Sequence, residues 1–271
     1  MGLLEGRVAF VTGVARGMGR SHAVRLAREG ASVIGIDIAA ETTSHNGYPA
    51  ASEADLKETA RLVEAEGRPC LIEVGDVRDS GRLDEVLTEG ISRFGDRLDI
   101  VVANAGINNW GRFWEMPDDQ WETMIDINLT GVWRTMKAAV PLMLSAGNGG
   151  SIITISSVAG LKALPSQSHY TAAKHGVTGL TKAAAIELGE YNIRVNSIHP
   201  WGVATALAED PYIEKTLTAH PSYIMSFGSV MPSIPTADSN DISDAVIYLA
   251  SDMSRAVTGT QLTVDMGATK V

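Results

Sequence analysis

Residues 7–37 read RVAFVTGVARGMGRSHAVRLAREGASVIGID, and this stretch decides the fold. It begins with a β-branched and aromatic run typical of a buried strand, passes through three glycines into a helical stretch, and ends in a second strand at residues 32–37. Glycines at such a turn let the backbone approach a diphosphate, which then sits at the positive end of the helix. The closing acid, Asp37, lies eighteen residues beyond Gly19, near the ~20 expected for a carboxylate that binds ribose hydroxyls. This order predicts a nucleotide-binding site; a tight turn without a ligand is the alternative.

The same alternation of strands and helices continues along the chain. We expect strands near residues 7–12, 32–37, 69–74, 98–103, 151–156, 193–198 and 261–264, and helices near 17–29, 53–66, 80–94, 118–144, 169–190 and 240–250. This pattern predicts an α/β fold: a single doubly wound (Rossmann) domain over residues 1–271, with a mostly or wholly parallel seven-stranded sheet and helices on both faces. A ligand should bind beyond the carboxyl ends of the strands. The polar residues and turn residues expected at those ends are Gly13, Asp37, Asp76, Asn104, Ser157 and Pro200.

Tyr170 and Lys174 supply a candidate acid-base pair, because residues four apart on a helix share one face. A phenol with a pKa of about 10 is a poor catalyst at neutral pH. A neighbouring ammonium favours the phenolate, so we expect Lys174 to lower the pKa of Tyr170. Ser157, presented from a strand end, can share a substrate oxygen with the tyrosine. These groups together can move a proton to or from an alcohol.

Five motifs in order resemble the short-chain dehydrogenase/reductase family over nearly the whole chain. They are the G-x3-G-x-G turn at 13–19, Asn104-Ala105-Gly106, Asn128, Ser157 with Tyr170 and Lys174, and Pro200 with Gly202 to Thr205. Ala103 stands where the family has a first Asn, and Trp201 stands where it has a glycine. The resemblance implies four catalytic residues: Asn128, Ser157, Tyr170 and Lys174. Ser156 is expected to turn away from the site.

The resemblance also implies the role of each residue. Tyr170 is the general base for the alcohol, Lys174 holds the nicotinamide ribose, Ser157 stabilises charge on the substrate oxygen, and Asn128 positions a water in a proton relay. Thr205 is expected to anchor the carboxamide, and Asp76-Val77 to cap the adenine. The cofactor-binding residues are expected to be Gly13, Arg16, Gly17, Met18, Gly19, Asp37, Ile38, Asp76, Val77, Asn104, Ala105, Gly106, Tyr170, Lys174, Pro200, Gly202, Val203 and Thr205.

Charge argues for NAD as the cofactor. Asp37 would repel a 2′-phosphate and bind a free 2′-hydroxyl, and no basic residue directly follows it. Arg16 is the residue that could instead pair with that phosphate in NADP; its other expected roles are a salt bridge or solvent exposure.

The connection at residues 38–52 (IAAETTSHNGYPAAS) is long for a turn between a strand and a helix. With Arg16 to His22, it resembles the carveol-dehydrogenase-like branch of the family, which is associated with the redox carrier mycofactocin. That branch implies NAD that stays bound between turnovers and is reoxidised by an external redox carrier. A solvent-exposed insertion without function is the alternative.

The segment at about 206–236 is rich in Pro, Met and aromatic residues and is expected to cover the substrate. Apolar side chains on such a cover predict a small hydrophobic alcohol or ketone, because methionine adapts to varied shapes. The expected substrate-binding residues are Ser157, Asn108, Gln167 and Trp201. For the last three, ordinary core packing is the alternative.

The amino-acid composition excludes several classes of partner and of protein. The net charge of −10 argues against nucleic acid or anionic lipid as a partner, and no apolar run approaches a membrane span. The single cysteine, Cys70, excludes an internal disulfide and is expected to be buried and inert. We expect a cytoplasmic protein with no signal peptide, and a homotetramer from the family resemblance.

The remaining aromatic and histidine residues are given structural roles. No metal site is expected, because His22 and His199 have no cluster of ligands near them in sequence. His169 and His175 are expected to be solvated or capped, and Trp114 and Trp121 to be core or interface anchors.

We therefore expect an NAD-dependent oxidoreductase that interconverts a hydrophobic secondary alcohol and its ketone, with a carveol-like terpene alcohol as one candidate, and with tightly held NAD. The alternatives are a short-chain reductase of another carbonyl compound with dissociable NAD, an epimerase or dehydratase using the same Tyr/Lys pair, and a catalytically idle NAD-binding regulator.

Overall fold

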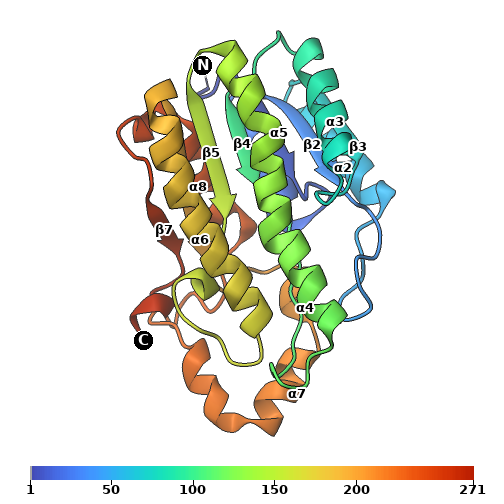
Figure 1. The fold of residues 1–271 in the computed structure, drawn as a ribbon, viewed down its shortest axis with the longest axis vertical. Helices are drawn as coiled ribbons and strands as arrows, with labels where there is room; N and C mark the ends of the chain where they lie inside the picture. The colour runs from blue at the N-terminus through green and yellow to red at the C-terminus, as the bar shows by residue number, and fades with distance from the viewer. Residues whose placement is uncertain (1) are drawn as a thin grey trace.

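Seven strands form one wholly parallel sheet in the computed structural model, which describes residues 2–271 (Figure 1). The strands are β1 (Val8–Thr12), β2 (Ser32–Asp37), β3 (Cys70–Val74), β4 (Ile100–Ala103), β5 (Gly150–Ile155), β6 (Ile193–Pro200) and β7 (Gln261–Val264). Their order is β3-β2-β1-β4-β5-β6-β7, and every neighbouring pair is parallel. The strand order reverses between β1 and β4, which is where such folds bind ligands. The predicted single doubly wound domain with a seven-stranded sheet is confirmed.

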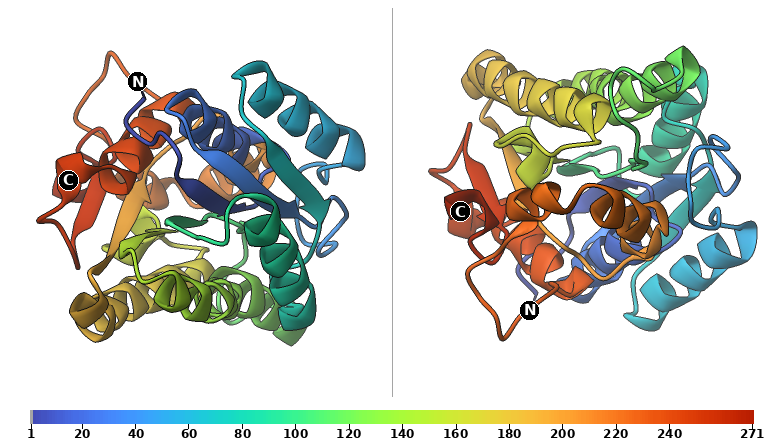
Figure 2. Two further views of the ribbon diagram at one scale, coloured as in Figure 1. Left: turned by 90° about the horizontal axis from the view of Figure 1, so that it is seen from above. Right: turned by 90° about the horizontal axis from the view of Figure 1, so that it is seen from below.

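Helices cover both faces of the sheet (Figure 2). They are α1 (Gly17–Arg28), α2 (Glu53–Ala65), α3 (Ser80–Arg93), α4 (Asp118–Ile125), α5 (Gly131–Ala146), α6 (Ser168–Leu188), α7 (Tyr212–Ala219) and α8 (Ser239–Ala250). Side chains alternate along each strand between two separate cores. Phe10 packs in the core beneath α3, α5 and α6, whereas its neighbour Val11 packs in the core beneath α1, α2 and α8. This double burial explains why the strands read as continuous apolar runs.

The helix expected at residues 118–144 is continuous but contains one π-helical turn. A π-helical turn at Asp126–Thr130 separates α4 from α5. Such a turn inserts an extra residue into the helix and is frequent at functional sites. Asn128 lies within it, so the defect falls at a predicted catalytic residue.

The long connection and the proposed cover lie at the carboxyl edge of the sheet. Residues 38–52 contain neither helix nor strand, as expected. The segment 206–236 folds into a short 3-10 helix at Ala206–Glu209, then α7, then a 3-10 stretch at Pro221–Phe227. The strands point toward this segment, and α7 runs across the end of the sheet (Figures 1 and 2).

Some expectations about single residues are wrong. Trp114 and Trp121 are not core residues, because 60% and 42% of their surfaces are exposed. Their other expected role, as interface anchors, stays a prediction. Cys70 is only half-buried, although burial raises the pKa of its thiol to about 11, as expected for an inert group. Across residues 2–271, no helix is long and apolar enough to cross a membrane.

Candidate active site

The glycine turn has the backbone shape that an anion site requires. Gly13 and Gly17 have φ of +73° and +55°, values that favour glycine. A Cβ on Gly19 would overlap the Gly13 carbonyl oxygen, so this close approach of strand and helix admits no side chain. α1 begins at Gly17, and its N-cap residue Arg16 makes no side-chain cap hydrogen bond. The first amide groups of α1 are therefore not capped by that side chain and can bind a diphosphate.

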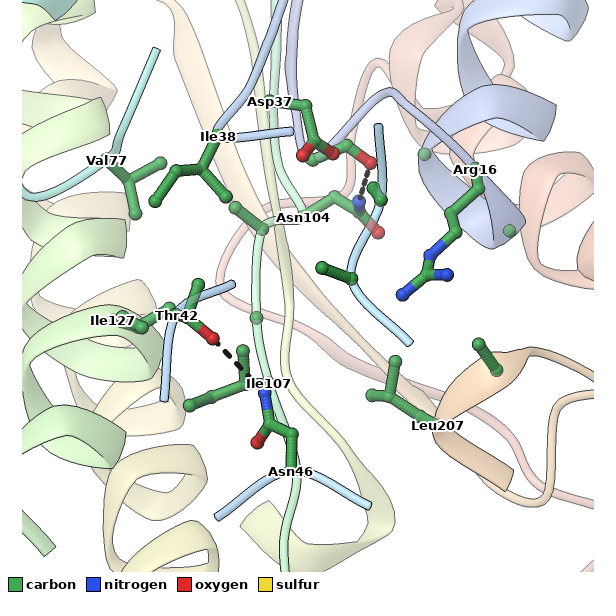
Figure 3. A pocket seen from close by; sticks show the side chains of 18 of the residues that line it. Arg16, Asp37, Ile38, Thr42, Asn46, Val77, Asn104, Ile107, Ile127 and Leu207 are labelled. Atoms are coloured by element: carbon green, nitrogen blue, oxygen red, sulfur yellow. Dashed lines mark hydrogen bonds between the residues drawn. The ribbon is translucent and has the colours of Figure 1, made fainter. Parts of the chain in front are cut away.

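A cavity of about 420 Å³ opens at this turn and extends to α6, the helix that carries Tyr170 and Lys174. Figure 3 shows Arg16, Asp37, Ile38, Val77 and Asn104 around it. Fifteen of the expected cofactor residues line it: Gly13, Arg16, Gly17, Met18, Gly19, Asp37, Ile38, Asp76, Val77, Asn104, Ala105, Gly106, Tyr170, Lys174 and Thr205. Pro200, Gly202 and Val203 do not line it.

Backbone amides fix the carboxylate of Asp37 at the end of β2. Its Oδ2 accepts from Ala15 N at 3.1 Å, and its Oδ1 accepts from Ala39 N at 3.0 Å. Each oxygen keeps a further lone pair that can accept from a ribose hydroxyl. Arg16 lines the cavity, and its guanidinium donates to the carbonyl of Pro49 in the 38–52 loop.

Asn104 joins β4 to the glycine turn. Its Nδ2 donates to Thr12 O at 2.9 Å and to Gly13 O at 3.3 Å. Its side-chain oxygen is buried and has no hydrogen-bond partner among residues 2–271. A carboxamide oxygen in this state costs free energy unless a ligand donates to it. Together with the glycine turn, this acceptor fits a dinucleotide that carries hydrogen-bond donors.

Helix α6 brings Tyr170 and Lys174 to the other end of the cavity. The Lys174 Nζ lies 5.5 Å from the centroid of the Tyr170 ring and donates to Ile155 O at 2.8 Å. Ser157 is buried and accepts from Ala159 N at 3.1 Å. Ser156 donates to Lys174 O at 3.0 Å and so turns toward α6. Ser156 nevertheless lines the cavity, whereas Ser157 does not. Ser157, Tyr170 and Lys174 thus converge where β5 ends.

Burial, and not Lys174, has the largest effect on the pKa of Tyr170. It raises the pKa of Tyr170, while the Ser157 hydroxyl acts in the opposite direction. Burial also lowers the pKa of Lys174 to about 8. The expected lowering of the Tyr170 pKa is therefore wrong for this state, because the site disfavours both charged forms. A further positive charge near the phenol would be needed to favour the phenolate.

The side chain of Asn128 is fully engaged with the loop that follows β4. Its Oδ1 accepts from Ile107 N and its Nδ2 donates to Ile107 O, both at 2.8 Å. A Cβ on Gly106 would approach Asn128 Oδ1 to 2.7 Å, so the two residues fit closely. The side chain of Asn128 therefore ties the π-helical turn to the loop that follows β4.

The expected substrate residues, which are Ser157, Asn108, Gln167 and Trp201, all lie outside the described cavity. Gln167 Nε2 donates to Asn108 Oδ1 at 3.0 Å. The Trp201 ring stacks on Phe227 at 5.9 Å, and Trp110 lies 5.6 Å from the same ring. These aromatic contacts join the segment 206–236 to the ends of β4 and β6.

The 38–52 loop contributes residues that were not singled out from the sequence. Thr42, Asn46, Tyr48 and Pro49 line the cavity (Figure 3). The unusual length of the loop singled it out in the sequence. Nothing in the sequence distinguished these four side chains from their neighbours. Leu207, from the cover, also lines the cavity.

The histidines belong to the scaffold. Among residues 2–271, no group of three or more His, Cys, Asp or Glu side chains could hold a metal. His175 contacts the Thr171 carbonyl one turn earlier, as expected of a capped residue. His169 is fully buried and bonded to Asn109, so its expected solvation or capping is wrong. Helix α6 turns this residue inward against the loop after β4.

Comparisons with known proteins agree with this geometry. A family model described as enoyl-(acyl carrier protein) reductase matches residues 13–269. The chain belongs to the short-chain dehydrogenase/reductase family. That description names the model and not the reaction of this chain.

Three relatives of this short-chain dehydrogenase/reductase cover almost all of it. An uncharacterised NAD-dependent oxidoreductase of Mycobacterium tuberculosis is 54% identical over 99% of this chain and 98% of its own. The (−)-trans-carveol dehydrogenase of Rhodococcus erythropolis is 43% identical over 99% of both chains. The crystal structure of a short-chain dehydrogenase from Mycobacterium paratuberculosis bound to NAD is 46% identical, covers 100% of both chains and has a TM-score of 0.97.

Proposed function

We propose that this protein oxidises a hydrophobic secondary alcohol to its ketone, and catalyses the reverse reaction, with NAD that stays bound between turnovers. The chain is an NAD-dependent short-chain alcohol dehydrogenase or ketone reductase. We infer its substrate class, the retention of NAD and the role of each residue from the site.

The residues around the cavity fit NAD. The glycine turn would hold the diphosphate, Asp37 the adenosine ribose, and Lys174 the nicotinamide ribose. Asp76 forms an ion pair with Arg78 that orients its carboxylate beside Val77, at the adenine end. When bound, NAD supplies the hydride acceptor, and the protein supplies orientation and proton transfer.

Proton transfer is assigned to Tyr170. The phenol oxygen takes the proton of the alcohol, while the Ser157 hydroxyl donates to the same substrate oxygen and stabilises the charge that develops there. Lys174 and the positive charge of the oxidised cofactor favour the phenolate that burial disfavours. Asn128 positions a water that connects Lys174 to solvent.

The substrate class is inferred from the aromatic walls. Trp110, Trp201 and Phe227 form a continuous apolar surface between the cover and the ends of β4 and β6. A ring or aliphatic body can pack there, whereas its hydroxyl must reach Ser157 and Tyr170. The carveol dehydrogenase of R. erythropolis supports a terpene alcohol as one such substrate.

The loop contacts carry the proposal that NAD is retained. Gly47 N donates to Asp210 Oδ2 in the cover at 3.3 Å, and a Cβ on Gly47 would overlap that carboxylate. His45 contacts Asp119 at the start of α4 at 3.1 Å, and Arg16 bonds Pro49 O. The loop is therefore fastened on both sides of the cavity it lines. A cofactor beneath it cannot leave until several of these contacts break, so an external redox carrier must reoxidise it.

Replacing residues 40–50 by a short Gly/Ser turn tests retention. The native protein should keep NAD through desalting, turn over poorly with added NAD alone, and recover with an artificial electron acceptor. The loop variant should release NAD faster and respond to free NAD. A native protein that purifies empty and turns over freely with soluble NAD would overturn the retention proposal and leave an ordinary dissociable dehydrogenase.

We also infer a homotetramer. Ile186 on α6 and Trp133 on α5 are 83% and 44% exposed, on the two long helices that lie side by side over one face of the sheet (Figure 1). Burying this face between subunits would remove apolar surface from water. Light scattering of the purified protein measures the mass, and a monomer would contradict this inference.

A further inference from the structure

Two consecutive asparagines connect the loop over the cofactor to the helix that carries the catalytic pair. We call Asn108 and Asn109, with their partners on both sides, the asparagine bridge. Asn108 N donates to the Tyr48 hydroxyl at 3.1 Å, and Asn108 Oδ1 accepts from Gln167 Nε2 at 3.0 Å. Tyr48 belongs to the 38–52 loop, whereas Gln167 is the N-cap residue of α6. Asn108 thus forms one connection from the loop to the catalytic helix.

Asn109 forms the second connection and is fully buried. Its Nδ2 donates to Asn46 Oδ1 in the loop at 3.1 Å. Its Oδ1 contacts His169 Nε2 at 2.6 Å and accepts from Gln120 Nε2 of α4 at 2.8 Å. Both lone pairs of this oxygen are therefore used, and the side chain cannot rotate without losing three contacts. In a buried site, such a network specifies one geometry.

His169 transmits this geometry to the active site because it immediately precedes Tyr170. A carboxamide oxygen only accepts, so His169 contributes an Nε2–H donor. Its Nδ1 is buried and has no hydrogen-bond partner within the part of the chain that the structure describes. The bond to Asn109 is therefore the hydrogen bond that orients the ring. Burial lowers the pKa of His169 to about 4, so the ring stays a neutral donor at neutral pH.

We propose that the asparagine bridge couples the closed position of the 38–52 loop to the alignment of Tyr170, so that NAD release and catalysis depend on the same hydrogen bonds. Asn109 and His169 are positioning residues in this scheme. The coupling to NAD release rests on the proposed retention of NAD. Its consequence is that a change on the helix side, at a residue that does not line the cofactor cavity, alters how fast NAD leaves.

His169→Ala tests the bridge without changing a residue that lines the cavity. Two rates are measured: release of bound NADH, followed by its fluorescence during a chase with excess NAD, and a single turnover of bound NAD with a secondary alcohol. His169→Ala should speed release and slow the single turnover, each about fivefold or more, as expected when one ordinary hydrogen bond is lost. His169→Gln should stay close to the native rates, because glutamine retains an Nε2–H donor. His175→Ala, on the same helix but bonded only within it, is the matched control and should change neither rate.

A double-mutant cycle then tests coupling directly. In protein that already carries Asn46→Ala, His169→Ala should have little additional effect on either rate, because the connection is already broken. Full additivity would overturn the proposal, and so would a lowered melting temperature with both rates unchanged. If the native protein itself releases NADH rapidly, the retention proposal fails. In that case the bridge is still judged by whether the two substitutions combine non-additively in the single-turnover rate.

Discussion

The nucleotide end of the cavity and the covering segment at 206–236 are built in opposite ways. At the nucleotide end, backbone geometry holds the site: glycines allow the turn, and amides fix the carboxylate of Asp37. In the covering segment, Asp210 is the only buried residue, and Met225 and Ile224 are 82% and 62% exposed. The first region is preorganised, whereas the second has little apolar burial of its own to hold one position.

This difference fits the ligand that we propose for each region. The dinucleotide is the same compound in every turnover, so a preorganised site can match it and loses little conformational entropy of its own on binding. Hydrophobic substrates differ in shape, and methionines and a lightly packed segment can adapt to them. The hydrogen bond between Gly47 and Asp210 joins the loop over the nucleotide end to the covering segment, so under this proposal it is where cofactor and substrate binding meet.

The largest effect on turnover is expected at Tyr170, the proposed proton-transfer group between the two regions. Tyr170→Phe removes the proposed proton-transfer group and should lower turnover by at least ~10²-fold. NAD binding should be unchanged, because the phenyl ring and Lys174 remain in place. Steady-state kinetics with an alcohol, together with the NAD content of the purified variant, measure both. Retained activity would show that another group transfers the proton and would move the catalytic centre away from α6.

A smaller effect is expected within the rigid nucleotide end. Asp37→Ala removes the carboxylate that would repel a 2′-phosphate, so the preference for NAD over NADP should fall by about tenfold, the change produced by roughly 1.4 kcal/mol. Binding of each cofactor to the native protein and the variant gives the ratio. If the native protein already binds NADP more tightly, Arg16 controls the site and the interpretation of Asp37 is wrong.

The smallest of the three effects is expected in the covering segment, where we consider the stability of the fold. Met225→Ser changes a mostly exposed residue and should alter the free energy of unfolding by no more than ~0.5 kcal/mol. Chemical denaturation measures this, and the same variant should keep its NAD. A large loss of stability would mean that another subunit buries Met225 in the assembled protein. The covering segment would then be exposed only in the isolated chain.

Much of this architecture could be predicted locally. The run from Arg7 to Asp37 sets strand, turn, helix and acid within consecutive residues, and glycine is the residue type that tolerates the required backbone angles. Tyr170 and Lys174 share a helix face for the same short-range reason. The strand ends then meet at one edge, because parallel strands connected by right-handed crossovers leave no other arrangement. The seven-stranded parallel sheet therefore followed from pattern alone, whereas most of the expected cofactor residues were implied by the family resemblance.

Other features depend on contacts between distant segments, which no local pattern encodes. The sequence placed the long loop at residues 38–52, but only the folded chain brings Tyr48 to Asn108, and both Asn46 and His169 to Asn109. The pKa of Tyr170 was misjudged for the same reason: proximity to Lys174 is readable from spacing, whereas burial is a property of the whole packed structure. The sequence by itself determined the fold, the cofactor turn and the proposed acid-base pair, since each is set by residues close together in the chain. Tertiary structure alone decided how the loop is fastened over the cavity and which charge state the catalytic groups favour, because hydrogen bonding and desolvation depend on neighbours in space.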